Sequence, residues 1–242
     1  MSQMHRAVIP YESIDPLTIG AAGNDELVYR DTLEIDIPEA NLLAEIRPDE
    51  PEAVGLLALM LLHDARRASR ETAGGDIVLL EEQDRALWDP EQIADGLRLV
   101  EDALRMPGPP QSYAVQAAIA ALHARAPSYR DTDWPQIAGL YEVLLRINPS
   151  PVIELNHAAA ISMVDGPARA LALIDALQAR GGLDGYELMP AVRADLLRRL
   201  GRHDAAREAY LAATAATQLQ PLRRLYARRL AEMHSANRSS DN

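Results

Sequence analysis

The sequence contains no cysteine, no lysine and no phenylalanine, and aromatic residues make up only 4% of its 242 residues. Without cysteine the chain forms no disulfide, no thiolate nucleophile and no cysteine-ligated zinc site. Because aromatic residues are so scarce, leucine, alanine, isoleucine and valine must build the core, and these residues suit closely packed helices. All 24 basic residues are arginine, which we interpret as the coding bias of a GC-rich bacterial genome.

Long apolar runs are also missing. No stretch approaches the roughly 20 apolar residues that span a bilayer, and the first residues lack the apolar region of a signal peptide. The formal net charge is −12, and the first 120 residues hold 23 acidic side chains against 9 arginines. Such an acidic half disfavours broad contact with DNA phosphates. We therefore expect a cytoplasmic protein that contacts neither membrane nor DNA directly.

The sequence lacks the common catalytic motifs. It has no GxSxG element, no P-loop and no dinucleotide-binding fingerprint. Its six histidines are scattered without a second ligand at metal-binding spacing. The acidic run from Glu81 to Asp84 has no base or nucleophile beside it in the sequence, and a solvated face is the plainer reading. We predict no metal, no cofactor and no enzymatic activity.

What the sequence does contain is a helical repeat. Ala158 and Ala170 recur 36 positions later as Ala194 and Ala206, and the turn at Asp165-Gly166 recurs 35 positions later at Leu200-Gly201. Small residues at these positions allow two helices to approach closely, and a period near 34 residues resembles a tetratricopeptide (TPR) helical hairpin. The predicted fold is all-α, a TPR-like right-handed array of antiparallel helical hairpins.

The density of helix breakers divides the chain into three parts. Prolines and glycines predict an irregular N-terminal arm over 1–25, and a polar composition predicts a disordered tail over 234–242. Residues 26–233 form one predicted helical domain, whose first clear helix begins at Pro38. A second helix is expected over 52–68, with Gly55 marking the close approach of a neighbouring helix, and an arginine-rich helix beginning at Pro221 is expected to close the array.

Four stretches together resemble a known family. They are RPDEPEAVGLLALMLLHDARR, DIVLLEEQDRALWD, QAAIAALHARAPSYRDTDWPQIAGLYEVLLRINPSPVIELNHAAA and DGYELMPAVRADLLRRLGRHDAAREAYLAA. In this order they look like the TPR-like C-terminal extension of bacterial extracytoplasmic-function RNA polymerase sigma factors. The resemblance implies association with sigma factors and a role in transcription regulation. The residues before Asn24 do not resemble the promoter-binding sigma domains, so we expect a module that binds transcription proteins rather than one that starts transcription.

Five residues are candidates for contact with a partner protein. Arg85 and Trp88 are of types favoured at binding hot spots. The alternative is that Trp88 packs in the core and Arg85 makes an internal ion pair. Asp131 and Trp134 are further candidates. The alternative is a structural role for both, Asp131 in a loop and Trp134 at the start of a helix. Asn156 is expected to line a concave groove and to hydrogen-bond a bound peptide, unless it bonds a neighbouring helix.

The predicted function is protein interaction rather than catalysis. The expected partners are sigma-factor core domains, RNA polymerase or a regulator, and the alternative is a free-standing TPR-like adaptor unrelated to transcription. The arginine cluster of the last helix, Arg223, Arg224, Arg228 and Arg229, is interpreted as either a solvent-facing surface or a nucleic-acid contact.

Overall fold

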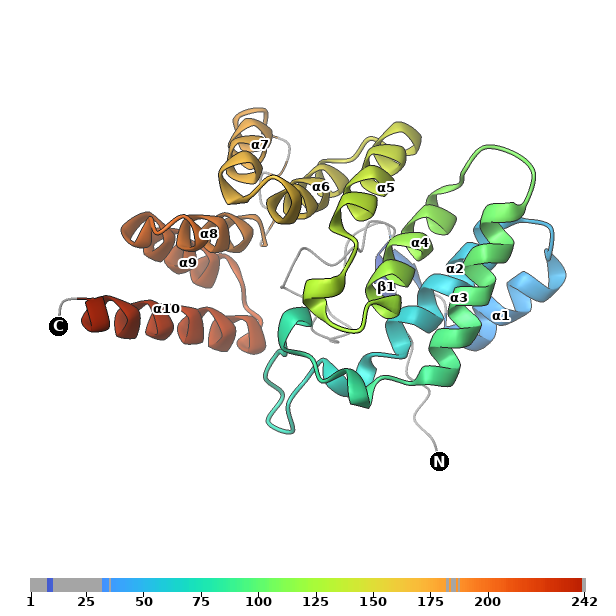
Figure 1. Ribbon diagram of the computed structural model, residues 1–242, viewed down its shortest axis with the longest axis horizontal. Coiled ribbons are helices and arrows are strands. Elements are labelled where there is room, and N and C mark those ends of the chain that lie inside the picture. Colours follow the sequence, from blue (N-terminus) through green and yellow to red (C-terminus); the bar gives the residue numbers. More distant parts are fainter. Residues whose placement is uncertain are drawn as a thin grey trace.

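The chain folds into an all-α array, as predicted, with one pair of three-residue strands before it. The computed structural model describes residues 8–10, 32–34, 36–181, 183, 186 and 188–240, with the side chains of the last helix described as far as His234. The helices follow one another along a curved path from α1 to α10 (Figure 1). No helix in these residues has the length and apolar character that a membrane span needs.

Ten α-helices and four short 3-10 helices make up the array in the described residues. The α-helices are α1 (Ile37–Ile46), α2 (Pro51–Asp64), α3 (Pro90–Arg105), α4 (Ser112–Arg125), α5 (Trp134–Ile147), α6 (Pro151–Val164), α7 (Pro167–Ala179), α8 (Met189–Arg199), α9 (His203–Ala216) and α10 (Gln220–Ser240). The 3-10 helices are η1 (Arg67–Ser69), η2 (Leu80–Glu82), η3 (Arg85–Leu87) and η4 (Tyr129–Asp131).

The two segments of the predicted repeat are the hairpins α6–α7 and α8–α9. The turns contain Gly166 and Gly201, whose φ angles of 89° and 71° lie in the left-handed region that favours glycine. The small residues that recur between the hairpins are buried on facing helix sides (Ala158, Ala170, Ala194 and Ala206). Helices α6, α7, α8 and α9 pack each against the next. This arrangement is consistent with the predicted TPR-like repeat.

The beginning of the helical region is set by local capping. Asp36 and Glu39 form a capping box, and Pro38 lies in the first turn, one residue after the start of α1 at Ile37. Strand β2 (Thr32–Glu34) pairs antiparallel with β1 (Val8–Pro10), so the predicted helical domain includes a strand. The remainder of the predicted arm over 1–25 lies outside the described residues.

Two helix ends differ from the sequence expectation. The helix predicted over 52–68 ends at Asp64 and continues only as the short η1. At the other end of the chain, α10 continues to Ser240, although a disordered tail is predicted from residue 234. No proline or glycine follows Pro221, so nothing in the sequence forces the helix to stop, and each added residue extends an existing helix without a new nucleation cost.

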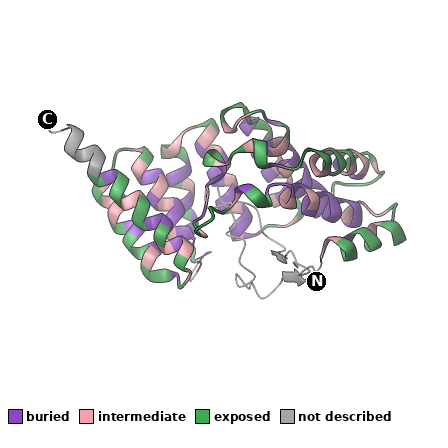
Figure 2. Ribbon diagram, turned by 90° about the horizontal axis from the view of Figure 1, so that it is seen from below, coloured by how far each residue is buried: buried purple, intermediate pink, exposed green. Residues whose placement is uncertain are grey.

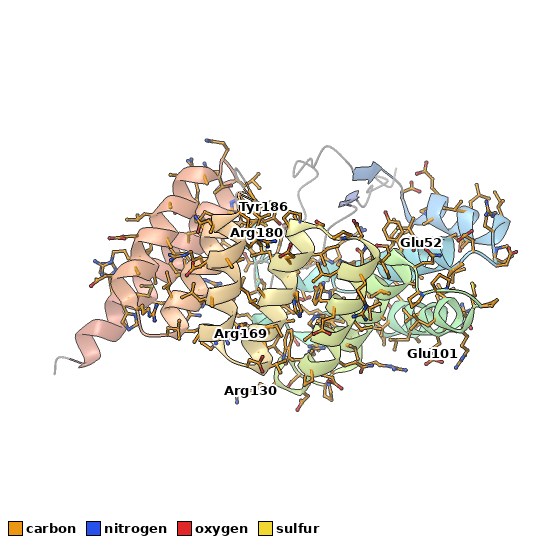
Figure 3. All side chains as sticks on the ribbon, turned by 90° about the horizontal axis from the view of Figure 1, so that it is seen from above. Glu52, Glu101, Arg130, Arg169, Arg180 and Tyr186 are labelled. Carbon is orange, nitrogen blue, oxygen red and sulfur yellow. The ribbon has the colours of Figure 1, made fainter. Side chains whose placement is uncertain are left out.

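The core depends on backbones that approach closely. A Cβ atom placed on Gly55 of α2 would lie 2.6 Å from the backbone nitrogen of Ala114 in α4, which confirms the predicted close contact. The same pair of helices is joined by Glu52, which accepts a 2.6 Å hydrogen bond from the Tyr113 backbone amide at the start of α4. Glu52 lies in the first part of the array, on α2 (Figure 3). Its burial raises the pKa of its carboxyl group. Figure 2 shows buried residues gathered on the facing sides of the helices.

One irregular segment departs from nearest-neighbour packing. Residues 71–84, which we call the strap, run from η1 towards η3 and pass alongside α10 (Figure 1). The strap contributes Ile77 and Leu79 to the buried apolar cluster formed by side chains of α6 to α10. It therefore joins an early part of the array to its last helix.

Substitution of Gly55 by alanine tests the close helix contact. The added methyl group meets α4 backbone atoms that cannot move independently, so we expect a loss of about 1–3 kcal/mol in the free energy of unfolding. Gly139 of α5 is the matched control, because an added Cβ there has nothing within 4 Å; Gly139→Ala should gain about 0.5–1 kcal/mol. Urea unfolding followed by circular dichroism measures both, and equal effects of the two variants would contradict the packing described.

Candidate protein-interaction site

Arg85 is half-buried between η3 and the end of α4. Its Nη1 donates hydrogen bonds of 2.7 Å to the backbone carbonyls of His123 and Ala126, at the end of α4. Its guanidinium lies 4.3 Å from the ring centroid of Trp88, within the range of a cation–π interaction. Burial lowers the pKa of the Arg85 guanidinium; the nearby charge of Arg66 lowers it further, and Asp131 opposes this. Its observed role is to attach η3 to α4.

Trp88 is only 6% exposed and belongs to the same internal arrangement. Its Nε1 donates a 2.9 Å hydrogen bond to Ser69 Oγ, and Arg66 lies on its ring at 5.7 Å from the centroid. Ser69 Oγ has one proton to donate and lies 2.8 Å from the Arg66 carbonyl and 3.2 Å from Gln83 Oε1. These contacts fix the two ends of the strap together. A role of Arg85 and Trp88 in binding a partner stays a prediction.

Trp134 and Asp131 lie around the turn between α4 and α5. Trp134 is 6% exposed and packs edge-on against His123 and Tyr129, with ring centroids 5.2 Å apart in both pairs. Asp131 accepts a 2.6 Å hydrogen bond from Ser128 Oγ within the η4 turn. Asp133 caps α5 and accepts a hydrogen bond from the Gln136 amide. These contacts organise the turn before α5, and partner binding by Asp131 and Trp134 stays a prediction.

Asn156 is buried on α6 with 2% of its surface exposed. Among the described residues, neither Nδ2 nor Oδ1 of its amide has a hydrogen-bond partner, and Trp134 Nε1 has none either. Asn156 and Trp134 line one cavity of about 10 Å³, together with Leu80 of the strap and side chains of α4 and α5. A cavity of this size has room for roughly one water molecule. The structure therefore brings two of the five predicted residues together, at an internal site.

The strap explains why Asn156 does not line an open groove. Leu80 is 2% exposed and closes the cavity beside Asn156. A second cavity of about 20 Å³ lies next to the first, shares His123 with it, and is lined also by His63, Arg66 and Gln116. Neither cavity holds more than one or two waters. In the residues described by the structure, no group of three histidine, aspartate or glutamate side chains is arranged to hold a metal ion.

The arginines of α10 make internal contacts rather than a free basic surface. Arg224 pairs with Asp76 and donates a 2.7 Å bond to the Gly75 carbonyl. Arg228 pairs with Glu82 at 2.8 Å and Arg229 with Glu81 at 3.0 Å. The fourth arginine, Arg223, donates to the Thr217 carbonyl at 2.9 Å. Two members of the acidic run from Glu81 to Asp84, which was expected to be a solvated face, thus form ion pairs with the arginine cluster of α10.

Helix α1 carries an exposed apolar face that was not predicted from the sequence. Leu42 is 56% exposed, Ile46 65% and Leu43 37%. Ala40, on the side of the helix away from Leu42 and Ile46, is fully buried in the cluster of α2, α3 and α4. The spacing of Leu42, Leu43 and Ile46 places them on one helix face. The segment ANLLAEI carries this signal, but periodicity alone does not tell which apolar face of a helix meets the core.

Comparisons with known proteins place the chain among relatives of undescribed function. Residues 21–104 match a family described as "Family of unknown function (DUF6596)". An uncharacterized protein of Rhizobium meliloti (strain 1021) is 44% identical over 192 residues, which cover 78% of this chain and 44% of that protein. The chain therefore spans less than half the length of this relative. No solved structure matches the chain.

The family match covers α1, α2, the strap and nearly all of α3. It contains Arg85, Trp88 and the exposed face of α1. The description of the family gives no activity or partner, so the resemblance to sigma-factor extensions stays a prediction at this level.

Replacement of Arg85 by methionine tests its role as an internal attachment. The variant leaves two carbonyls without their donor and removes the cation–π contact, so we expect a loss of about 2–4 kcal/mol in unfolding free energy. Arg130 of η4 is an exposed arginine and serves as the control (Figure 3); Arg130→Met should change stability by less than about 0.5 kcal/mol. Similar urea midpoints for the two variants would argue against the attachment.

Asn156 provides a second stability test. Leucine fills nearly the same volume without a buried unpaired amide, so Asn156→Leu should raise the unfolding free energy by about 1 kcal/mol or more. Asn156→Asp places an unpaired carboxyl group at the same buried position and should destabilise the chain. Thermal unfolding of both variants measures this. A lower melting temperature for the leucine variant would mean that the amide is satisfied in solution.

Proposed function

We propose that the chain is a protein-interaction module related to the C-terminal extension of extracytoplasmic-function sigma factors, and that it regulates transcription initiation by binding sigma-factor core domains, RNA polymerase or a regulator. The observation that carries the proposal is the exposed apolar face of α1, formed by Leu42, Leu43 and Ile46. A terminal helix of a repeat array normally turns a polar face outward. An apolar face at this position is instead typical of a surface that contacts another domain.

The position of this face agrees with the resemblance to sigma factors. Helix α1 is the first helix of the array, and the sigma domains of the resembled family precede the extension in sequence. The relative from Rhizobium meliloti is more than twice as long as the part that this chain covers. A longer protein of this kind has further sequence that can pack on α1. The rest of the proposal follows from the resemblance of the four sequence stretches.

The experiment is co-purification of the tagged chain from the bacterium that encodes it. The expected result is enrichment of sigma-factor or RNA polymerase subunits over a tag-only control. The variant Leu42→Ser/Ile46→Ser should reduce this enrichment at least tenfold, since about 1.4 kcal/mol corresponds to a factor of ten. Leu211→Ser is the matched control, because Leu211 of α9 is 55% exposed and lies far along the array.

Three outcomes separate the alternatives. Loss of binding in the α1 variant alone supports the proposal. Enrichment of proteins unrelated to transcription would identify the chain as a free-standing adaptor. The absence of both sigma-factor and polymerase subunits from the wild-type sample would refute the proposed function.

A further inference from the structure

The strap is seated on the array through its side chains. Ile77 and Leu79 are 3% and 2% exposed and join the apolar cluster of α6 to α10, which includes Tyr226. The next residue, Leu80, faces the other way, into the cavity beside Trp134 and Asn156. Successive side chains thus enter two different apolar surfaces, as they do in an extended peptide bound in a groove.

The backbone of the strap makes its hydrogen bonds locally. The Thr72 amide donates to the Asp76 carbonyl at 2.9 Å, the Val78 amide to Arg70 at 2.8 Å and the Glu82 amide to Leu79 at 2.7 Å. Among the described residues, no backbone–backbone hydrogen bond joins the strap to helices α6 to α10. The strap is therefore not a structural continuation of these helices. Its contacts with them run through side chains of the strap and through Arg224, which donates to the Gly75 carbonyl, and a separate peptide of similar sequence can reproduce them.

Charge complementarity fixes the position of the strap on α10. Three acidic side chains, Asp76, Glu81 and Glu82, meet Arg224, Arg229 and Arg228 respectively. The acidic side chains are 33–54% exposed, so these pairs are screened by salt and each contributes at most about 1 kcal/mol.

Arg229 has a second partner on its own helix. Its side chain is only 11% exposed, and it pairs with Glu232 of α10 at 3.0 Å as well as with the strap. Burying an unpaired cation is costly. Because Glu232 stays in place, release of the strap does not leave Arg229 unpaired. The surface is therefore compatible with both a bound and a released strap.

From these contacts we infer that the surface formed by α6 to α10, with Arg224, Arg228 and Arg229 at its edge, is a peptide-binding site that the strap occupies. The partner that fits it is an extended peptide in which apolar residues precede two acidic residues, as in the strap's own sequence GDIVLLEEQD (75–84). The inference deepens the proposed function, since it names the partner's chemistry and a control on binding. A tethered strap competes at an effective concentration of the order of millimolar, so the closed protein admits a free peptide only weakly.

The test uses the full chain and a fluorescent peptide with the sequence of residues 75–84. Glu81→Arg/Glu82→Arg replaces two ion pairs by like charges opposite Arg228 and Arg229. The repulsion adds to the loss of both pairs and should shift the strap towards the released state, while the surface itself is unchanged. Fluorescence anisotropy should then show at least tenfold tighter binding of the peptide than to the wild type. A peptide with lysines in place of Glu81 and Glu82 is the control and should not bind.

Adding Arg228→Glu to this variant provides a matched reversal. The new glutamate attracts the arginine at position 82 of the strap and repels the acidic peptide, so peptide binding should fall back to the wild-type level. Hydrogen exchange of residues 71–84 reports strap release independently: exchange should be faster in the double variant and slower again in the triple variant. If the double variant fails to fold, as judged by circular dichroism, Glu81→Gln/Glu82→Gln is the milder substitute.

Two results would overturn the inference. One is a released strap, seen by hydrogen exchange, with no peptide binding. The other is a strap that stays protected in a folded charge-reversal variant. Both differ from failure of the proposed function, which is the absence of sigma-factor and polymerase subunits in co-purification while the peptide still binds.

Discussion

The contact between the strap and α10 is the constraint on which the arrangement of the array depends. Repeat arrays are held together by contacts between neighbouring units, but Asp76 and Arg224 are 148 residues apart in sequence. The three ion pairs are partly exposed and together contribute at most about 3 kcal/mol. The larger share comes from Ile77 and Leu79, since burial of each aliphatic side chain contributes about 1.5–3 kcal/mol. The apolar residues hold the strap, and the charges set its register on α10.

Several features of the interior follow from this contact. Arg85 and Trp88 fix the end of the strap to α4 and η1, and the capping Asp89 then starts α3. Leu80 covers the cavity in which Asn156 lies. The inner face that would serve as a binding groove in an open repeat array is therefore occupied by the chain itself. The exposed apolar face of α1 is left as a surface on which another domain can pack.

The sequence predicted most of the helices because their signals are local. Asp89 and Asp133 cap α3 and α5, and Gly166 and Gly201 supply the turns of the two hairpins, as these residue types do wherever they occur at helix ends. Gly55 predicted a close neighbour because glycine is unfavourable inside a helix without a packing reason. The predicted end of α2 and the predicted length of α10 were wrong. Apolar periodicity does not decide where a helix ends: tertiary contacts decide it for α2, and the absence of a stop signal decides it for α10.

The sequence by itself determined the all-α fold, the hairpin repeat and the absence of cysteine chemistry, because composition and helix-period spacing are properties of short stretches. Only the tertiary structure decided that Asn156 is buried, that Trp134 shares its cavity, and that the arginines of α10 pair with the acids at 76–82. These contacts join residues far apart in the chain, and long-range pairing leaves no periodic trace in a single sequence. Both the acidic run and the arginine cluster are visible in the sequence. Only the fold shows that the acidic side chains form ion pairs with the arginines.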